Sequence, residues 1–260
     1  MIYGVTRASS GTIRVFGLDL NRHVRAVRSR LGVTLQQNVL IEALSPQENL
    51  RVFGRYHLLR EPELTRRTEQ LIDFLELRSH IDVPVRQLSG GFQRRLAIAL
   101  SLVNAPELLI LDEPTTGLDP AVRLALWSRV RDLRAGGTTV LITTHYMDEA
   151  QRLCDRVAIL AAGKVIASGP PTELIALRLA PEAVEFDCNL TEEAELLNGL
   201  EAPRRLRVGN RLTLYVQDAA GLIEQIRRHD AGDRRPLIIR PTNLEDVFLS
   251  LTGTSLEGNP

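Results

Sequence analysis

The sequence predicts an α/β protein with a parallel sheet, followed by a small α+β appendage. Two nearly continuous apolar runs, LLILDE and TTVLITT, flank a segment with helical periodicity. Strands buried on both faces are apolar throughout, and alternating strands and helices form parallel sheets. After about residue 179 the strands become short and are separated by turn residues, which indicates a second, smaller domain. We therefore expect an α/β domain over residues 1–179 and an α+β accessory domain over residues 180–260.

The first expected elements are two strand pieces, residues 12–17 and 31–35, on either side of the polar, arginine-rich stretch 21–30. Both pieces contain the β-branched and apolar residues that are typical of strands. We therefore expect the sheet to begin here.

A helical block of about residues 38–104 then interrupts the strands. Its first helix is expected over residues 47–58, because Ser45 suits an N-cap and Pro46 suits the first turn. A second helix is indicated by apolar residues that share one helical face, at positions 64, 71, 72 and 75.

The sheet resumes with a strand over 108–113, a helix with an apolar stripe over 122–133 and a strand over 138–144. A short helix from Tyr146 then leads to a hairpin over 156–169, in which a glycine supplies the positive φ of a tight turn. The accessory domain is expected to contain strands at 183–188, 205–208, 211–216 and 237–240 and helices at 222–228 and 244–251, with Gly209-Asn210 as a hairpin turn.

The overall composition excludes several classes of protein. The 32 basic and 32 acidic residues balance, so the net charge offers no general attraction for nucleic acid, and we expect no nucleic-acid partner. No apolar stretch approaches the roughly 18 residues of a membrane-spanning helix. Two cysteines, Cys154 and Cys188, are too few for a disulfide framework, so we expect a reducing, cytoplasmic location.

The first candidate site is the pair Asp112-Glu113, which follows four apolar residues and precedes Pro114. Ligands of parallel sheets bind beyond the carboxyl ends of the strands, where these carboxylates are expected. Asp112 suits a Mg²⁺ shell and Glu113 could polarise an attacking water. The alternative is a strand that ends in a solvated acidic turn.

Two further motifs are expected near these carboxylates. Ser89, Gly90 and Gly91 open a helix, and backbone N–H groups at a helix N-terminus favour anions; the alternative is an ordinary serine N-cap. His145 closes the strand 138–144. A lone histidine there is more often structural, but beside Glu113 its imidazole could contact a terminal phosphate.

Taken in order, LSGGFQRRL, LLILDEP, the GLD at 117–119 and TTH resemble the motifs of the ATPase subunits of ABC transporters. The resemblance implies an ABC-type P-loop NTPase core with an inserted helical signature subdomain, and ATP and Mg²⁺ as cofactors. It further implies that Asp112 serves Mg²⁺, that Glu113 is the catalytic carboxylate and that His145 senses the γ-phosphate.

The same resemblance identifies Ser89-Gly90-Gly91 as the signature motif, at the start of the signature helix, and implies roles for this motif and the loops around it. Ser89, Gly90, Gly91 and Gln93 would face a nucleotide held by a partner subunit, and Asp119 belongs to the D-loop beside the nucleotide. Gln36, at the end of the strand 31–35, fits the glutamine that contacts metal and water and couples to the membrane subunit. Gln37 is the competing choice.

More narrowly, ENLRVFGRY, TTGLDPAVR and PTNLEDVFLSLTG resemble the ATPases of exporters with separate membrane subunits, including antibiotic and lipo-oligosaccharide exporters. This implies a homodimer or a second ATPase subunit, permease partners, and a peripheral position on the inner face of the cell membrane. DNA-repair and translation ATPases share the LSGG and Asp-Glu chemistry, but they tend to show coiled coils or tandem cassettes.

The family's phosphate-binding loop, GxxxxGK[ST], does not occur in these 260 residues, and the one lysine, Lys164, lies in the expected hairpin. Three explanations are open: a start codon placed too late, a real truncation, or a degenerate subunit that supplies only the signature half of a composite site. The first is favoured, because the other motifs are intact. For the chain as given we expect no ATP hydrolysis by itself and a poorly folded monomer.

Overall fold

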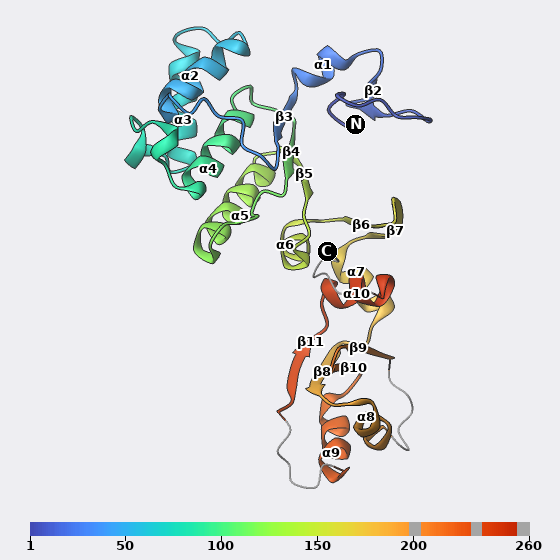
Figure 1. Cartoon of the computed structure of the whole chain (residues 1–260). Helices are drawn as coiled ribbons and strands as arrows, with labels where there is room; N and C mark the ends of the chain where they lie inside the picture. Colours follow the sequence, from blue (N-terminus) through green and yellow to red (C-terminus); the bar gives the residue numbers. More distant parts are fainter. Residues whose placement is uncertain (198–203, 230–235, 254–260) are drawn as a thin grey trace. The chain divides into compact units, whose positions relative to one another are not determined.

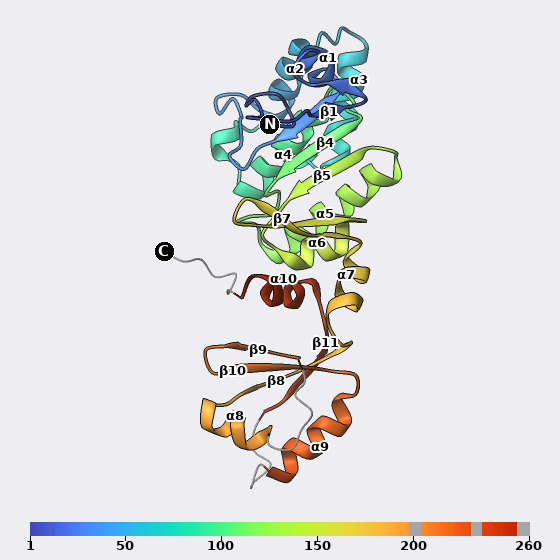
Figure 2. The same ribbon diagram turned by 90° about the vertical axis from the view of Figure 1, so that its right-hand side faces the viewer.

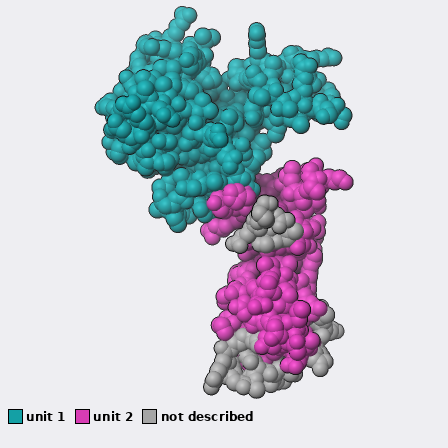
Figure 3. All heavy atoms as spheres, in the orientation of Figure 1, with its two compact units in different colours: residues 1–144 teal, residues 145–260 magenta. Residues whose placement is uncertain are grey.

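The structure is a computed structural model that describes residues 1–197, 204–229 and 236–253. The chain forms two compact units, Met1–Thr144 and His145–Pro260, which are coloured separately in Figure 3. Each unit is described by itself below.

The first unit contains the predicted parallel sheet. Its strands are β3 (Leu31–Thr34), β4 (Leu108–Asp112) and β5 (Thr139–Thr143), in the order β3-β4-β5, and Figures 1 and 2 show them side by side. Strand β4 is central, and its Leu109 and Leu111 are fully buried. These findings confirm the α/β fold class.

Strand β5 differs from the expectation of a strand covered on both faces. Residues 140–142 are only half-buried, and both terminal threonines are exposed. The reason is its position, because β5 lies at the edge of the sheet and pairs only with β4 among the described residues.

The expectation that residues 12–17 begin this sheet is wrong. They form a separate antiparallel hairpin of β1 (Arg14–Val15) and β2 (Leu18–Asp19). Phe16 and Gly17 both have positive φ, at 54° and 76°, which is the backbone of a tight hairpin turn. The hairpin and α1 (Val24–Arg28) pack around a small core of Val15, Leu20, Val27 and Leu31. We call residues 1–30 the N-terminal lobe.

The predicted helical block is confirmed. It contains α2 (Pro46–Tyr56), α3 (Glu63–Phe74) and α4 (Gly90–Ser101), with short 3₁₀ turns at 78–80 and 85–87. Ser45 and Glu48 form a capping box at the start of α2, as Glu48 also accepts from the Ser45 backbone N–H at 2.8 Å.

Helix α4 packs closely against β3. A Cβ atom added to Gly32 would lie 2.0 Å from the carbonyl oxygen of Ser101, so only glycine allows this approach. Helix α5 (Pro120–Ala135) begins at its N-cap Asp119 and contacts β5.

The second unit starts with α6 (Met147–Leu153) and the predicted hairpin of β6 (Val157–Ala161) and β7 (Lys164–Gly169). Lys164 is the first residue of β7, so the expected place of the lysine is confirmed. Helix α7 (Pro171–Arg178) follows.

The rest of this unit is a four-stranded antiparallel sheet in the order β11-β8-β10-β9. The strands are β8 (Glu182–Asp187), β9 (Arg204–Val208), β10 (Arg211–Val216) and β11 (Ile238–Pro241). Helices α8 (Leu190–Leu196) and α9 (Ala219–His229) contribute to a core with these strands. Helix α8 was not expected, because its 7 residues are too few to show periodicity.

The last helix, α10 (Leu244–Thr252), returns to pack on α6 and α7. Leu244 and Val247 of α10 share a core with Ala150 and Leu174. This packing explains why the compact units divide at 144/145, whereas the change to short strands after residue 179 suggested a boundary at 179/180. As a division of function, 1–179 and 180–260 stays a prediction.

Candidate functional site

The two candidate carboxylates lie where β4 ends. Asp112 pairs in register with Thr143 of β5, and the Thr143 hydroxyl donates a hydrogen bond to the Asp112 carboxylate. The backbone N–H of Glu113 donates to the Thr143 carbonyl at 3.0 Å. Strand pairing therefore holds both acidic residues at the carboxyl edge of the sheet, where ligands of α/β sheets bind.

Glu113 has a strained backbone, with φ at +48°. Left-handed backbone is uncommon for residues other than glycine, and it persists at positions where neighbouring contacts impose it. The Thr116 hydroxyl donates to the Glu113 carboxylate at 3.0 Å. The carboxylate is thus oriented by both its backbone and its side chain.

A buried arginine holds this edge of the sheet, and sequence reasoning missed it. Arg94 of α4 is 5% exposed and donates to the carbonyls of Asp112 at 2.7 Å, Glu113 at 2.9 Å and Pro114 at 2.9 Å. It also donates to the Leu35 carbonyl at 2.6 Å. One guanidinium therefore ties the signature helix to the ends of both β3 and β4.

A sequence signal for Arg94 existed. It shares one face of α4 with Ala97, Ile98 and Ser101, which are all buried, so the arginine stands on the apolar stripe of its helix. A buried charge needs partners, and six donated hydrogen bonds meet that need.

The amino end of α4 is open to solvent. Ser89 is the N-cap and accepts from the Phe92 N–H at 3.5 Å, while its residue remains exposed. A Cβ added to Gly90 would meet no atom within 4 Å. Free backbone N–H groups at such an end can approach an anion closely.

The amino ends of α4 and α5 lie together. A Cβ added to Gly91 would lie 3.4 Å from Val122 in the first turn of α5. The N-cap of α5 is Asp119, whose carboxylate accepts from the Val122 N–H at 2.9 Å. The signature glycines and Asp119 thus belong to one surface region.

Gln93 faces its own chain. Its side-chain amide donates to the carbonyls of Val85 at 3.2 Å and Leu88 at 3.1 Å. These bonds hold the loop that leads into Ser89. The expectation that Gln93 faces a partner's nucleotide stays a prediction.

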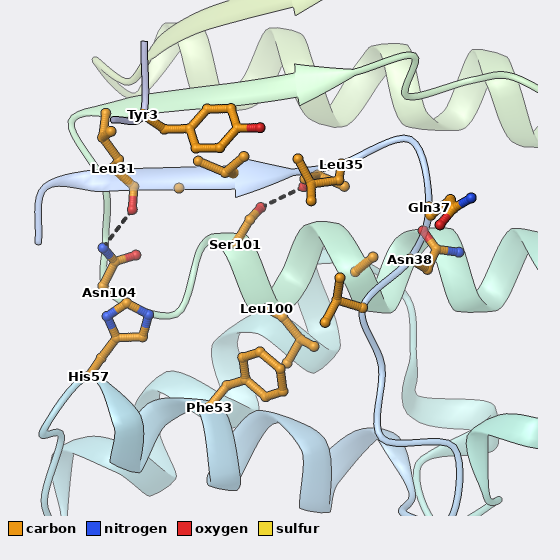
Figure 4. Close-up of a pocket in the computed structure, with 15 residues that line it drawn as sticks. Tyr3, Leu31, Leu35, Gln37, Asn38, Phe53, His57, Leu100, Ser101 and Asn104 are labelled. Atoms are coloured by element: carbon orange, nitrogen blue, oxygen red, sulfur yellow. Dashed lines mark hydrogen bonds between the residues drawn. The ribbon is translucent and has the colours of Figure 1, made fainter. Parts of the chain in front are cut away.

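The two glutamines after β3 differ in their surroundings. The backbone carbonyl of Gln36 accepts from Arg94 at 3.4 Å, so its place depends on the same guanidinium. Gln37 lines a cavity of about 280 Å³ between β3, α2 and α4. Figure 4 shows Gln37 and Asn38 at one end of this cavity, with Phe53 and His57 along another wall. Partial desolvation lowers the pKa of His57, although its side chain stays exposed.

His145 is the first residue of the second unit. Its ring packs against that of the neighbouring Tyr146, with 4.1 Å between the centroids and 40° between the ring planes. Its expected place beside Glu113 and its role toward a phosphate stay predictions.

Metal binding at this edge rests on few protein ligands. The described residues contain no group of three or more His, Cys, Asp or Glu that could hold a metal ion. Mg²⁺ fits such a site, because it usually keeps several waters and binds one or two carboxylates plus substrate phosphates. Asp112, beside Thr143, is the carboxylate that suits this role.

Comparison with known proteins identifies the family. Residues 1–116 match the ABC transporter family, and residues 190–253 match the C-terminal domain of the nodulation factor export protein NodI. The chain is 44% identical over 257 residues to the Nod factor export ATP-binding protein I of Sinorhizobium fredii, covering 99% of this chain and 74% of that protein. The chain belongs to the ATP-binding subunits of ABC transporters. A second relative of that name, from Cupriavidus metallidurans, is 42% identical over 98% of this chain and 84% of its own length.

Solved structures agree with this ABC assignment. An ATP-binding subunit of an ABC transporter has a TM-score of 0.60 at 30% identity and covers 66% of this chain and 72% of its own. CbiO1 of Clostridium perfringens, part of the CbiONQ transporter complex, has a TM-score of 0.61 at 29% identity, with 67% and 72% covered. A dimeric bacterial ABC transporter cassette has a TM-score of 0.59 at 25% identity, with 65% and 76% covered.

The predicted ATPase subunit of an ABC exporter is therefore confirmed, and it binds ATP. Within the part of the chain that the structure describes, no helix has the length and apolar character needed to cross a membrane.

Proposed function

We propose that this ABC subunit works as a dimer, or beside a second ATPase subunit, and couples ATP hydrolysis to export through separate permease subunits. The proposed cargo is a lipo-oligosaccharide of the Nod-factor kind, because relatives that cover nearly the whole chain are named for Nod factor export. The proposed location is the cytoplasmic face of the cell membrane.

The main support for ATP hydrolysis is the pair Asp112 and Glu113 at the end of β4, where Glu113 has a strained backbone. In this proposal Asp112 holds Mg²⁺, which would neutralise phosphate charge. The Glu113 carboxylate orients and polarises the attacking water. The Thr116 hydrogen bond and the Arg94 contact to the Glu113 carbonyl hold that carboxylate in place.

Ser89, Gly90 and Gly91 act in this proposal on the nucleotide of the opposite subunit. Support comes from the exposed amino end of α4, where the glycines leave backbone N–H groups accessible. Asp119 caps α5 beside them, so we assign it to positioning this shared surface. His145 contacts the terminal phosphate in this scheme.

The proposed contact with the permease is the segment after β3. Gln36 follows the sheet edge, and the neighbouring cavity is lined by Gln37 and Phe53 and bordered by Val39, which is 65% exposed. An apolar cavity with a few polar groups at its rim suits an inserted peptide segment. Because Arg94 joins this segment to the Glu113 backbone, movement of the segment would reach the carboxylate.

The test is Mg-ATP turnover and ATP binding by a chain extended upstream to include the phosphate-binding loop, and by the Glu113→Gln variant of that extended chain. The amide keeps the size of the side chain but loses its charge, so we expect a fall in turnover of about 100-fold or more with ATP binding unchanged. Glu107→Gln, at the opposite end of β4, is the matched control and should keep parental turnover. Equal turnover in Glu113→Gln and the parent would refute the role of Glu113. If this chain without the extension supports turnover only beside a second subunit that carries the phosphate-binding loop, a composite site is favoured.

A further inference from the structure

The balanced charge of the chain conceals a strongly basic N-terminal segment. Residues 1–35 contain six arginines and one acidic residue, Asp19, whereas the remainder carries 26 basic and 31 acidic residues. The balanced net charge of the whole chain therefore does not exclude polyanion binding by this segment, because electrostatic attraction depends on the local field.

Most of this positive charge is unpaired and exposed. Arg30 forms an ion pair with Glu107. The other five, Arg7, Arg14, Arg22, Arg25 and Arg28, are exposed and form no ion pair within the described residues. Arg28 donates only to neutral backbone carbonyls, and Asp19 accepts from backbone N–H groups of the turn before α1.

Apolar side chains lie among these arginines. A Cβ added to Gly4 would be 2.5 Å from Val24 of α1, so the segment that carries Ile2 and Val5 lies against the arginine-bearing helix. Ile2 is 38% exposed and Val5 is 69% exposed. The lobe packs on β3 through a small core that includes Leu31, and it belongs to the first unit (Figure 3). It therefore presents both charge and apolar surface outside the site described above.

We propose that the N-terminal lobe binds directly to the surface of a membrane rich in anionic lipids, with the arginines at headgroup phosphates and the apolar side chains at the interface. This inference rests on the proposed function, which places the subunit at a membrane. Basic clusters with adjacent apolar residues suit this role. Nucleic acid is disfavoured, because the lobe's aromatic residues, Tyr3 and Phe16, are partly buried and not offered for base stacking.

The distribution of charge along the chain would also orient the subunit on an anionic membrane. The rest of the chain has an excess of acid, so an anionic surface repels it and attracts the lobe. The lobe would thus orient the subunit on the membrane as well as hold it there. The lobe's contribution to membrane binding is separate from that of a permease, because the lobe would bind to lipid without any membrane protein.

The experiment measures sedimentation of the purified chain with vesicles. The vesicles contain phosphatidylglycerol and phosphatidylcholine, or phosphatidylcholine alone. We expect binding to the anionic vesicles only, at about 0.1 M salt, and its loss at about 1 M salt, where screening shortens to about 3 Å. Replacing Arg14, Arg22 and Arg25 by glutamine should weaken binding about fivefold for each arginine, or on the order of 100-fold together.

The matched control replaces Arg55, Arg60 and Arg66 by glutamine. These arginines are also exposed in the first unit and have no ion pair within the described residues, so net charge falls equally. We expect this variant to keep parental binding to within about twofold. Melts followed by Trp127 fluorescence establish that both variants are folded.

Three results would overturn the proposal. These are equal losses in the two triple variants, equal binding to neutral vesicles, or tighter binding to a DNA duplex than to anionic vesicles at the same salt. Failure of the lobe is distinguishable from failure of the proposed function. In the chain extended to include the phosphate-binding loop, the lobe variant should keep parental ATP turnover while its vesicle binding falls, whereas the Glu113→Gln variant should bind vesicles normally.

Discussion

Replacing Arg94 by alanine tests the most connected buried contact of the site. Arg94 is 5% exposed and donates to the carbonyls of Leu35, Asp112, Glu113 and Pro114 at 2.6 to 2.9 Å. In the alanine variant these carbonyls lose a charged donor at a largely buried position.

The expected loss in free energy of unfolding follows from these contacts. A hydrogen bond to a charged group contributes about 1.5–3 kcal/mol, but bonds that share one guanidinium do not add. Leaving one buried acceptor without a donor costs about 1–3 kcal/mol, and Arg94 serves four carbonyls. A whole domain is stable by only about 5–15 kcal/mol, so this single change should remove a large share.

Urea unfolding followed by tryptophan fluorescence measures this loss in the first compact unit, which contains Arg94. Trp127 is the one tryptophan of the sequence, and it is buried in α5 of the first unit. Arg94→Lys should lose less, because a lysine keeps the charge but cannot span both strands with a planar fork. Arg86→Ala, at an exposed arginine, should change stability by less than about 0.5 kcal/mol. If Arg94→Ala lost less than about 1 kcal/mol, the guanidinium would not hold this edge.

Three other predictions concern the site and the second unit. Gly90→Asp should reduce turnover at the opposite subunit's nucleotide at least tenfold, because a carboxylate there repels phosphate. Mixed dimers of one variant and one parental subunit provide the test. If only the nucleotide site of the variant subunit itself were damaged, the action on the opposite subunit would be refuted. Burial and Asp246 raise the pKa of Tyr215 above its ordinary 10.0, so stability present below pH 10 should fall as pH rises further, and Tyr215→Phe should flatten that fall in denaturation curves. Arg240→Gln removes a partner of the buried Asp246 and should cost about 3 kcal/mol in chemical denaturation; a loss under about 1 kcal/mol would contradict the importance of this pair.

The sequence by itself determined the local elements and the order of the motifs. The run that ends at Asp112 is a buried strand, Ser45 and Ser89 cap the predicted helices, and Lys164 begins a strand of the predicted hairpin. These features depend on neighbours within a few residues, such as apolar periodicity, capping side chains and turn glycines. Such signals are therefore readable without knowing which distant segments meet.

Only the tertiary structure decided how distant segments meet. The contacts of Arg94 with residues 35 and 113, the packing of α10 on α6 and the separation of the β1–β2 hairpin from the parallel sheet all join or divide segments far apart in the chain. The strained backbone of Glu113 belongs to the same class, since strand pairing and the Arg94 bonds impose it. The physical reason is that the local sequence around a residue does not specify its contacts with distant residues. A buried charge requires hydrogen-bond acceptors, but the packing of the whole unit decides which carbonyls provide them.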